Sequence, residues 1–299
     1  MQLLFVIGFP RSGTKLLLQL LRTNSQISGP KVEVNLAHQF EKLDFEAFKK
    51  ALEQSTLWVN MGDVKKKVES FLKEYSVEDE KTWEEFYIQF LESCDLNKGQ
   101  TYVIDKSPRY ITKGEGLLKN FPNAKYIHIT RDVRAIANSH ANVWKKNVYR
   151  VADQWNKSVL SFHRASKGKS QVLVIRYEDL VENPKKCVLK IQNFLELETP
   201  FDIDNVSSNE SHGSVAATGI VSTAKVSTYK PSVEKRMEEY AFNGLKEFGY
   251  SVKFASQQKE MPFISKLRYF LNDQLNVLGF HIKEKGLVKG VDYFIRLKK

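Results

Sequence analysis

Residues 3–21 read LLFVIGFPRSGTKLLLQLL, and this stretch decides the fold. The apolar run Leu3–Ile7 predicts a buried strand, the small residues of Gly8–Thr14 predict a tight loop, and the leucine-rich run Lys15–Leu21 predicts a helix. A strand, a loop and a helix in this order aim several backbone N–H groups and a helix N-terminus at one place. The loop therefore predicts a site for an anion such as a phosphate.

The loop resembles the Walker A motif, G-x-x-x-x-G-K-[ST], but departs from it in an informative way. Gly8 and Gly13 have the Walker spacing, whereas Thr14 and Lys15 stand in the reverse order and Arg11 adds a cation inside the loop. In a P-loop phosphotransferase the lysine reaches the β- and γ-phosphates and the hydroxyl holds Mg²⁺. The reversed order keeps an anion site but removes those parts. A glycine turn without a ligand is the simpler alternative.

Three further apolar runs alternate with helical patterns, at Thr101–Ile104, Lys125–Ile129 and Gln171–Ile175. This alternation predicts an α/β fold of P-loop type, with a parallel sheet flanked by helices. Ligands of such sheets bind beyond the carboxyl ends of the strands. We expect the loops after the four strands to converge on one site, and each carries a cation: they are Gly8–Thr14, Asp105–Arg109, Arg131–Arg134 and Arg176–Asp179.

Three segments stand outside this alternation. Residues 40–100 carry aromatic side chains at helical spacing, which is typical of a packed core, and we expect this helical insertion to cover the strand ends as a lid. Residues 205–230 are rich in Ser, Thr, Asn and Gly, which predicts a long loop. The main domain is predicted over 1–255, with 256–299 as a basic, aromatic extension packed on it.

The net charge of +11, from 46 Lys and Arg against 35 Asp and Glu, favours an anionic ligand, an acidic acceptor or a membrane surface. Because the basic residues are spread along the chain, nucleic acid is not expected as a partner. The basic, aromatic tail indicates at most a weak contact with a membrane surface. The sequence does not predict the oligomeric state.

The cysteines and histidines give no sign of a metal site. Cys94 and Cys187 are too few for a disulfide framework and are expected to be buried thiols, and the histidines are scattered. No signal peptide and no run of roughly 18 apolar residues is present. We therefore expect a cytoplasmic protein, or the catalytic part of a longer, anchored one.

Four segments together resemble the sulfotransferase family, in particular its Golgi-type and bacterial branches, which include tyrosylprotein and carbohydrate sulfotransferases. They are GFPRSGTKLL at 8–17, DKSPRY at 105–110, FPNAKYIHITRDVRAIANS at 121–139 and IRYEDL at 175–180. The resemblance covers about residues 3–250. It implies that 3′-phosphoadenosine-5′-phosphosulfate (PAPS) is the co-substrate, that adenosine 3′,5′-bisphosphate is released, and that no metal is required.

The resemblance also implies where the donor binds. Gly8, Pro10, Ser12, Gly13 and Thr14 belong to the loop that holds the 5′-phosphosulfate. Arg11 stands where the family places a cation near the sulfuryl group. Lys15, at the helix start, either reaches a phosphate or points to solvent.

The remaining donor contacts come from later motifs. Arg131 and Ser139 match the block that binds the 3′-phosphate, and an Arg fork suits a phosphate. Tyr177 matches a position close to the nucleotide, with a core tyrosine as the alternative. Ser222 and Lys225 match, more loosely, a loop that closes over PAPS. Asp132 and Arg134 of the same block have a simpler alternative, as a carboxylate at a helix start and a surface cation, and we expect Asp132 to cap the helix rather than to act in catalysis.

For the transfer step, the resemblance implies Glu33 as the base that deprotonates the acceptor hydroxyl, with His38 as the alternative. Lys106 resembles a family lysine at the transfer centre. Arg109 either holds an acidic acceptor or pairs with Asp105.

A saccharide or glycolipid is the favoured acceptor, ahead of tyrosine and of a small phenol or alcohol. Two other interpretations stay open. A P-loop kinase would use Asp105 for Mg²⁺, and a non-catalytic nucleotide-binding protein would turn Glu33 and Lys106 away from the donor site.

Overall fold

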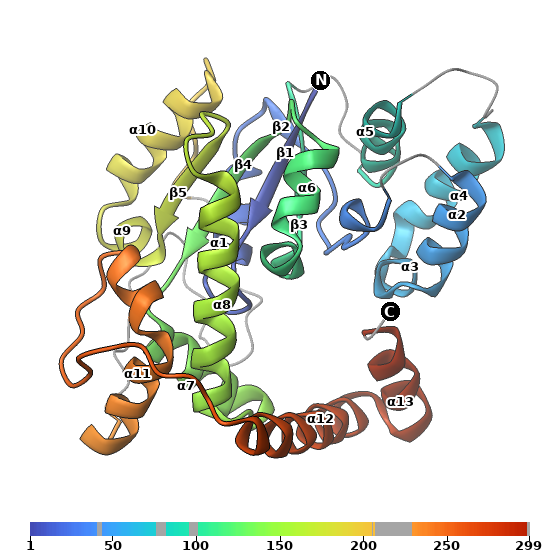
Figure 1. The fold of residues 1–299 in the computed structure, drawn as a ribbon. Helices are drawn as coiled ribbons and strands as arrows, with labels where there is room; N and C mark the ends of the chain where they lie inside the picture. Colours follow the sequence, from blue (N-terminus) through green and yellow to red (C-terminus); the bar gives the residue numbers. More distant parts are fainter. Residues whose placement is uncertain (41–43, 76–81, 96–100, 205, 207–228, 298–299) are drawn as a thin grey trace.

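The computed structural model describes residues 1–40, 44–75, 82–95, 101–204, 206 and 229–297. At its centre is a five-stranded sheet in the order β2-β3-β1-β4-β5, with every neighbouring pair parallel (Figure 1). The strands are β1 (Gln2–Ile7), β2 (Ile27–Ser28), β3 (Tyr102–Lys106), β4 (Lys125–Thr130) and β5 (Val172–Arg176). The predicted parallel α/β sheet is confirmed. The short edge strand β2 was not predicted.

Helices cover both faces of the sheet because the strand side chains alternate between two cores. Leu3, Phe5 and Ile7 of β1 lie in one cluster of buried side chains, and Leu4 and Val6 lie in the other. The first cluster includes side chains of α6 (Gly114–Asn120), α7 (Val133–Trp144), α8 (Val148–Ser166) and α11 (Pro231–Glu247). The second includes side chains of α1 (Thr14–Leu21), α9 (Tyr177–Glu182) and α10 (Pro184–Leu195).

The insertion between β2 and β3 is helical, and its aromatic residues form core. It consists of α2 (Phe45–Gln54), α3 (Thr56–Asn60), α4 (Lys65–Glu74) and α5 (Trp83–Ser93), which lie together on one side of the sheet (Figure 1). The Phe48 ring makes edge-to-face contacts with Phe86 and Phe90, both at 5.0 Å between centroids. All three side chains are fully buried. Their spacing in the sequence predicted this packing.

Two helices follow the sheet domain and lie along one edge of the molecule, α12 (Phe263–Lys285) and α13 (Leu287–Arg296) (Figure 1). Buried Asp273 anchors α12 to the start of α8, where it accepts from Arg150 Nη1 and the Asn147 backbone N–H, both at 2.8 Å. The end of α13 reaches the insertion, since Arg296 Nη1 donates to the Glu53 carbonyl at 3.0 Å. Among the described residues, no helix is both long enough and apolar enough to cross a membrane.

The packing of α8 against α11 gives a test of the fold. A Cβ at Gly244 of α11 would lie 2.7 Å from a Trp155 ring carbon and 2.9 Å from Asn156 Oδ1, whereas a Cβ at Gly116 of α6 would meet nothing within 4 Å. We expect Gly244→Ala to lower the free energy of unfolding by about 1–3 kcal/mol through overpacking. Gly116→Ala should raise it by about 0.4–1 kcal/mol. Urea denaturation measures both, and equal effects of the two substitutions would contradict this packing.

Candidate active site

The register of the parallel strands brings the predicted loops to one edge of the sheet. Lys106 at the end of β3 pairs with Val6 of β1, two residues before the Gly8 loop. On the other side, Thr130 of β4 pairs with Arg176 of β5, so Arg131 and Tyr177 follow neighbouring strands. The convergence expected from the sequence is therefore present.

The loop after β1 is built to leave backbone N–H groups open to a ligand. A Cβ at Gly8 would lie 2.5 Å from Ser12 Oγ and 2.6 Å from the Ile129 carbonyl, so the loop closes tightly here. Gly13 has φ of 101° and directly precedes α1, and no side chain caps that helix. Ser12 Oγ is buried and has no hydrogen-bond partner among the described residues. An anion at the start of α1 would accept hydrogen bonds from the uncapped N–H groups and from the Ser12 hydroxyl.

Arg11 adds the positive charge of the loop and is held by two side chains of α7. Its Nε donates to Ser139 Oγ at 2.8 Å, and its guanidinium lies 5.7 Å from the centre of the Trp144 ring. Arg11 has φ of 74°, in the left-handed region that favours glycine. Burial and the nearby Arg131 lower the pKa of Arg11, which nevertheless stays protonated at neutral pH.

Arg131 connects the loop to the end of β5. Its Nη1 donates to the Arg11 carbonyl at 3.3 Å, and its guanidinium stacks over the Tyr177 ring at 4.0 Å. The same tyrosine ring lies against Gly13, where an added Cβ would approach it to 2.5 Å. Arg131 Nε is buried without a partner, and no carboxylate of the described residues pairs with Arg11 or Arg131. Two neighbouring guanidiniums without a counter-charge favour a ligand with more than one anionic group.

Glu33 and Lys106 meet on the other side of the loop. Lys106 Nζ donates to Glu33 Oε1 at 2.7 Å, and the lysine side chain is buried while that of the glutamate is 51% exposed. The hydrogen bond from Ser107 Oγ to Asn35 Oδ1, at 3.1 Å, ties the two segments together. A proton acceptor and a cation thus lie side by side, with the acceptor facing solvent.

Asp105 does not pair with Arg109. It is fully buried and accepts hydrogen bonds from the hydroxyls of Tyr87, at 2.7 Å, and Tyr110, at 2.6 Å. Burial raises the pKa of Asp105 from 3.8 to about 6, although both hydroxyls act in the opposite direction. Arg109 instead donates to the Leu297 carbonyl at the end of α13. Asp105 therefore fastens the end of β3 to the insertion.

The expectation that Arg134 is a surface cation is wrong. Arg134 is buried and forms ion pairs with Asp132 at 2.6 Å, Glu238 at 3.0 Å and Glu234 at 3.1 Å. The arginine thereby joins the start of α7 to α11. Asp132 does cap α7, accepting from the Arg134 backbone N–H at 2.8 Å, as the sequence predicted.

The other candidate positions lie as follows. Thr14 is buried at the first residue of α1, and Lys15 follows it half-buried. His38 packs edge-on against Tyr110, and burial together with nearby cations lowers its pKa to about 4. Ser222 and Lys225 lie outside the described residues. Cys94 and Cys187 are buried free thiols, as predicted.

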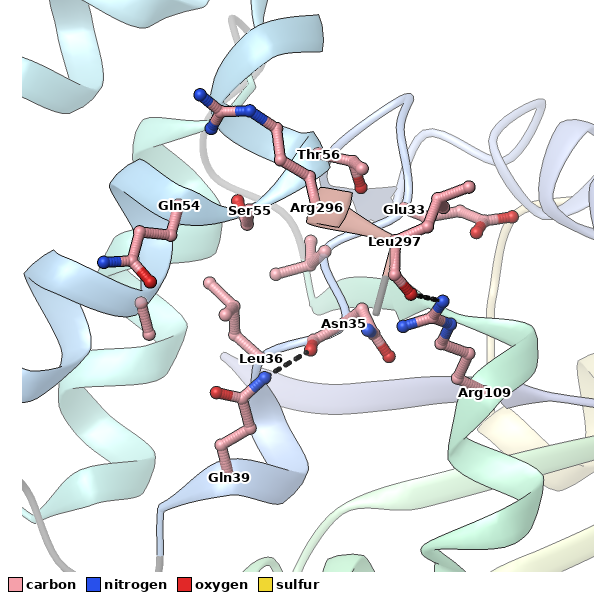
Figure 2. A pocket seen from close by; sticks show the side chains of 12 residues that line it. Glu33, Asn35, Leu36, Gln39, Gln54, Ser55, Thr56, Arg109, Arg296 and Leu297 are labelled. Carbon is pink, nitrogen blue, oxygen red and sulfur yellow. Dashed lines mark hydrogen bonds between the residues drawn. The ribbon is translucent and has the colours of Figure 1, made fainter. Parts of the chain in front are cut away.

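A cavity of about 300 Å³ adjoins Glu33 (Figure 2). Its walls come from residues 33–39, the junction of α2 and α3, and the end of α13. Figure 2 shows the hydrogen bond from Arg109 to the Leu297 carbonyl, which joins two of the residues that line this cavity. The residues that line it include several with hydrogen-bonding side chains, namely Glu33, Asn35, Gln39, Gln54, Ser55, Thr56, Arg109 and Arg296.

Sequence reasoning missed several of these groups. His140 contacts the Pro10 carbonyl through Nε2 at 3.0 Å, and its pKa is lowered to about 3, chiefly by burial. His140 and Trp144 are one helical turn apart, on the side of α7 that contacts the loop. Their four-residue spacing, directly after Ser139, is a signal that the sequence does contain. Arg296 had no such signal because only the fold brings it near Glu33.

Comparison with known proteins places the four segments named above in one family match. A profile of the sulfotransferase family matches residues 4–201. The chain belongs to the sulfotransferase family. The family membership expected from the four sequence segments is thus confirmed.

Two relatives show how far the likeness extends. An uncharacterised protein of Aquifex aeolicus (strain VF5) is 27% identical over 251 residues, which are 79% of this chain and 31% of that protein. The protein-tyrosine sulfotransferase of Drosophila melanogaster is 25% identical over 208 residues, covering 66% of this chain and 38% of the relative. The chain thus spans about a third of the length of these relatives.

Solved structures share the fold. The sulfotransferase domain from the curacin biosynthetic pathway superposes with a TM-score of 0.59 at 20% identity, covering 84% of this chain and 98% of that domain. The sulfotransferase domain of the Synechococcus PCC 7002 olefin synthase superposes with a TM-score of 0.60 at 23% identity. The match covers 84% of this chain and 95% of that domain.

The buried Asp105 gives a test of the site by pH. Because the folded protein holds this proton more tightly than the unfolded chain, the contribution of Asp105 to stability is full below about pH 4 and is lost as pH rises to about 6. Asp105→Asn has no such proton. Relative to wild type, its free energy of unfolding should therefore increase by on the order of 3 kcal/mol from acidic to neutral pH.

Urea denaturation at several pH values measures this difference. Asp63→Asn makes the same change of side chain at an exposed position and is the matched control. A difference between Asp105→Asn and wild type that stays the same at every pH would contradict the raised pKa of Asp105.

Proposed function

We propose that this protein is a sulfotransferase that moves a sulfuryl group from PAPS to a hydroxyl group of an acceptor. The observation that carries the proposal is the pair of guanidiniums, Arg11 and Arg131, held together at the Gly8–Thr14 loop without a carboxylate partner among the described residues. Such a site suits a nucleotide that carries anionic groups on both the 3′ and the 5′ position of its ribose. Membership of the sulfotransferase family supports the same donor.

The chain's own groups fit this donor. The open N–H groups before α1 and the buried, unpartnered Ser12 Oγ match the oxygens of a 5′-phosphosulfate, with Thr14 beside them. The unpartnered Arg131 Nε and the hydroxyl of Ser139 match a 3′-phosphate. Tyr177, stacked under Arg131, fixes the direction of that guanidinium.

PAPS supplies an activated sulfuryl group. In the proposed transfer, a bond forms between the acceptor oxygen and sulfur, and the bond from sulfur to the phosphate oxygen breaks. The acceptor proton goes to the Glu33 carboxylate, and the electron pair of the broken bond stays on adenosine 3′,5′-bisphosphate. Arg11 and Lys106 offset the negative charge that develops on the leaving oxygen.

The acceptor proposed for the cavity beside Glu33 is a saccharide, free or lipid-linked. Amide and hydroxyl side chains of Asn35, Gln39, Gln54 and Ser55 line the cavity and can bind several hydroxyl groups of one sugar. The insertion, which contributes α2 and α3 to this wall, would act as the lid. Tyrosine is the second candidate because several relatives are protein-tyrosine sulfotransferases at 25–26% identity.

The donor site predicts a selective effect of Arg131→Ala. We expect its affinity for adenosine 3′,5′-bisphosphate to fall about tenfold to a hundredfold, since charge-assisted hydrogen bonds to the 3′-phosphate are lost. Adenosine 5′-phosphosulfate lacks that phosphate and should bind almost as before. Isothermal titration calorimetry measures both, with exposed Arg164→Ala as the matched control.

Equal losses for the two ligands would overturn the assignment of Arg131 to the 3′-phosphate. The same titration with ATP separates the kinase hypothesis. Wild-type protein that prefers ATP with Mg²⁺ over the bisphosphate would contradict the sulfotransferase proposal itself.

The base is tested by Glu33→Gln, which keeps the shape of the side chain but cannot take the proton. We expect kcat for sulfuryl transfer to fall about 10²–10⁴-fold while the affinity for adenosine 3′,5′-bisphosphate stays within about twofold. Acceptors are screened with radiolabelled PAPS, and exposed Glu46→Gln serves as the matched control. Loss of bisphosphate binding in Glu33→Gln would make the residue structural and turn attention to His38.

A further inference from the structure

The outer side of α12 is an apolar stripe that faces solvent. Ile264, Leu267, Leu271 and Leu275 follow one another at three- and four-residue spacing, which places them on one face of the helix. Their exposed fractions are 80%, 49%, 54% and 68%. Leu278 and Ile282, which are partly exposed, continue the same spacing. This apolar face of α12 does not pack on the protein.

The orientation of α12 is fixed by its other side. Asp273 is fully buried against Arg150 and Asn147 of the α8 start, and His281 is buried toward α13. Turning the leucines inward would expose the Asp273 contacts. The orientation of α12 therefore keeps the apolar stripe on the surface.

The second helix also exposes apolar side chains, and both helices expose basic residues. Leu287 and Val288 at the start of α13 are 67% and 81% exposed. Arg268, Lys283, Lys285 and Lys289 are exposed on the same two helices. Within 263–297 the acidic residues are Asp273, which is buried, Asp292, which pairs with Arg296 at 2.8 Å, and Glu284.

We propose that α12 and α13 form a docking surface for a membrane that contains anionic lipid. Exposed leucine and isoleucine bordered by Lys and Arg is the pattern of a helix that lies in the plane of the interface. A second copy of the chain fits less well, because the two basic borders would face each other in a protein of net charge +11.

The docking surface is separate from the proposed donor site and does not depend on it. The last residue of α13, Arg296, lines the cavity beside Glu33. Binding to lipid is therefore measured without any enzymatic readout.

Co-sedimentation of the full chain with vesicles tests the proposal. We expect binding to vesicles of phosphatidylcholine with phosphatidylglycerol, weaker binding to phosphatidylcholine alone, and a decrease at high salt. The double variant Leu271→Ser/Leu275→Ser should bind the anionic vesicles at least about tenfold more weakly, because two apolar side chains no longer enter the interface. Exposed Leu189→Ser of α10 is the matched control and should bind like wild type.

A labelled variant gives a second measurement that does not rely on loss of binding. Since Cys94 and Cys187 are buried, an environment-sensitive thiol dye attaches selectively to Ile264→Cys, with Leu189→Cys as control. Anionic vesicles should shift the emission of the first dye to shorter wavelength and leave the second unchanged. Absence of vesicle binding by the wild-type chain would overturn the proposal. A dimer in sedimentation equilibrium that the double leucine variant abolishes, without vesicle binding, would make the stripe a contact between copies and would also overturn it.

Discussion

The parallel pairing of β1 with both β3 and β4 is the constraint on which the candidate site depends. Since all three strands run the same way, the residues that follow them must leave the sheet at one edge. The Gly8–Thr14 loop, Lys106 and Arg131 are separated by up to about 120 residues in the chain, yet each comes directly at the end of a strand. The apolar cores on both faces hold the strands in this register, so the stability of the sheet and the geometry of the site have one origin.

Charge is distributed unevenly around that edge. Arg134 has three carboxylates around it and joins α7 to α11, whereas Arg11 and Arg131 contact each other's segment and have no carboxylate among the described residues. Partly buried like charges at this distance raise the free energy of the protein without its ligand. The binding of an anion offsets this repulsion. Until then the guanidiniums are positioned by neutral side chains, since Ser139 and Trp144 contact Arg11 and Tyr177 contacts Arg131.

The sequence predicted those parts that local patterns determine. Apolar runs and the glycine loop located four strands to within about two residues at each end, and the aromatic spacing identified the core of the insertion. The two-residue strand β2 has no pattern of its own and exists through pairing with β3. Arg134 was misjudged because its partners Glu234 and Glu238 are about a hundred residues away. The contribution of α13 to the cavity could not be predicted for the same reason. The tyrosine partners of Asp105 are nearer in the chain, but their hydroxyls reach Asp105 only through the packing of α5 and of residues 108–112 on β3, which spacing does not encode.

The left-handed backbone of Arg11 has a consequence for protein engineering. Its φ of 74° is one that glycine adopts without strain and that an arginine side chain makes less favourable. A redesign that optimises each position for backbone preference would choose Arg11→Gly, and the variant would gain stability where the loop is most strained. It would also delete the guanidinium beside Ser139. Thermal stability and charge at the loop are therefore opposed at this one residue, and a stabilised variant should be sought at other positions.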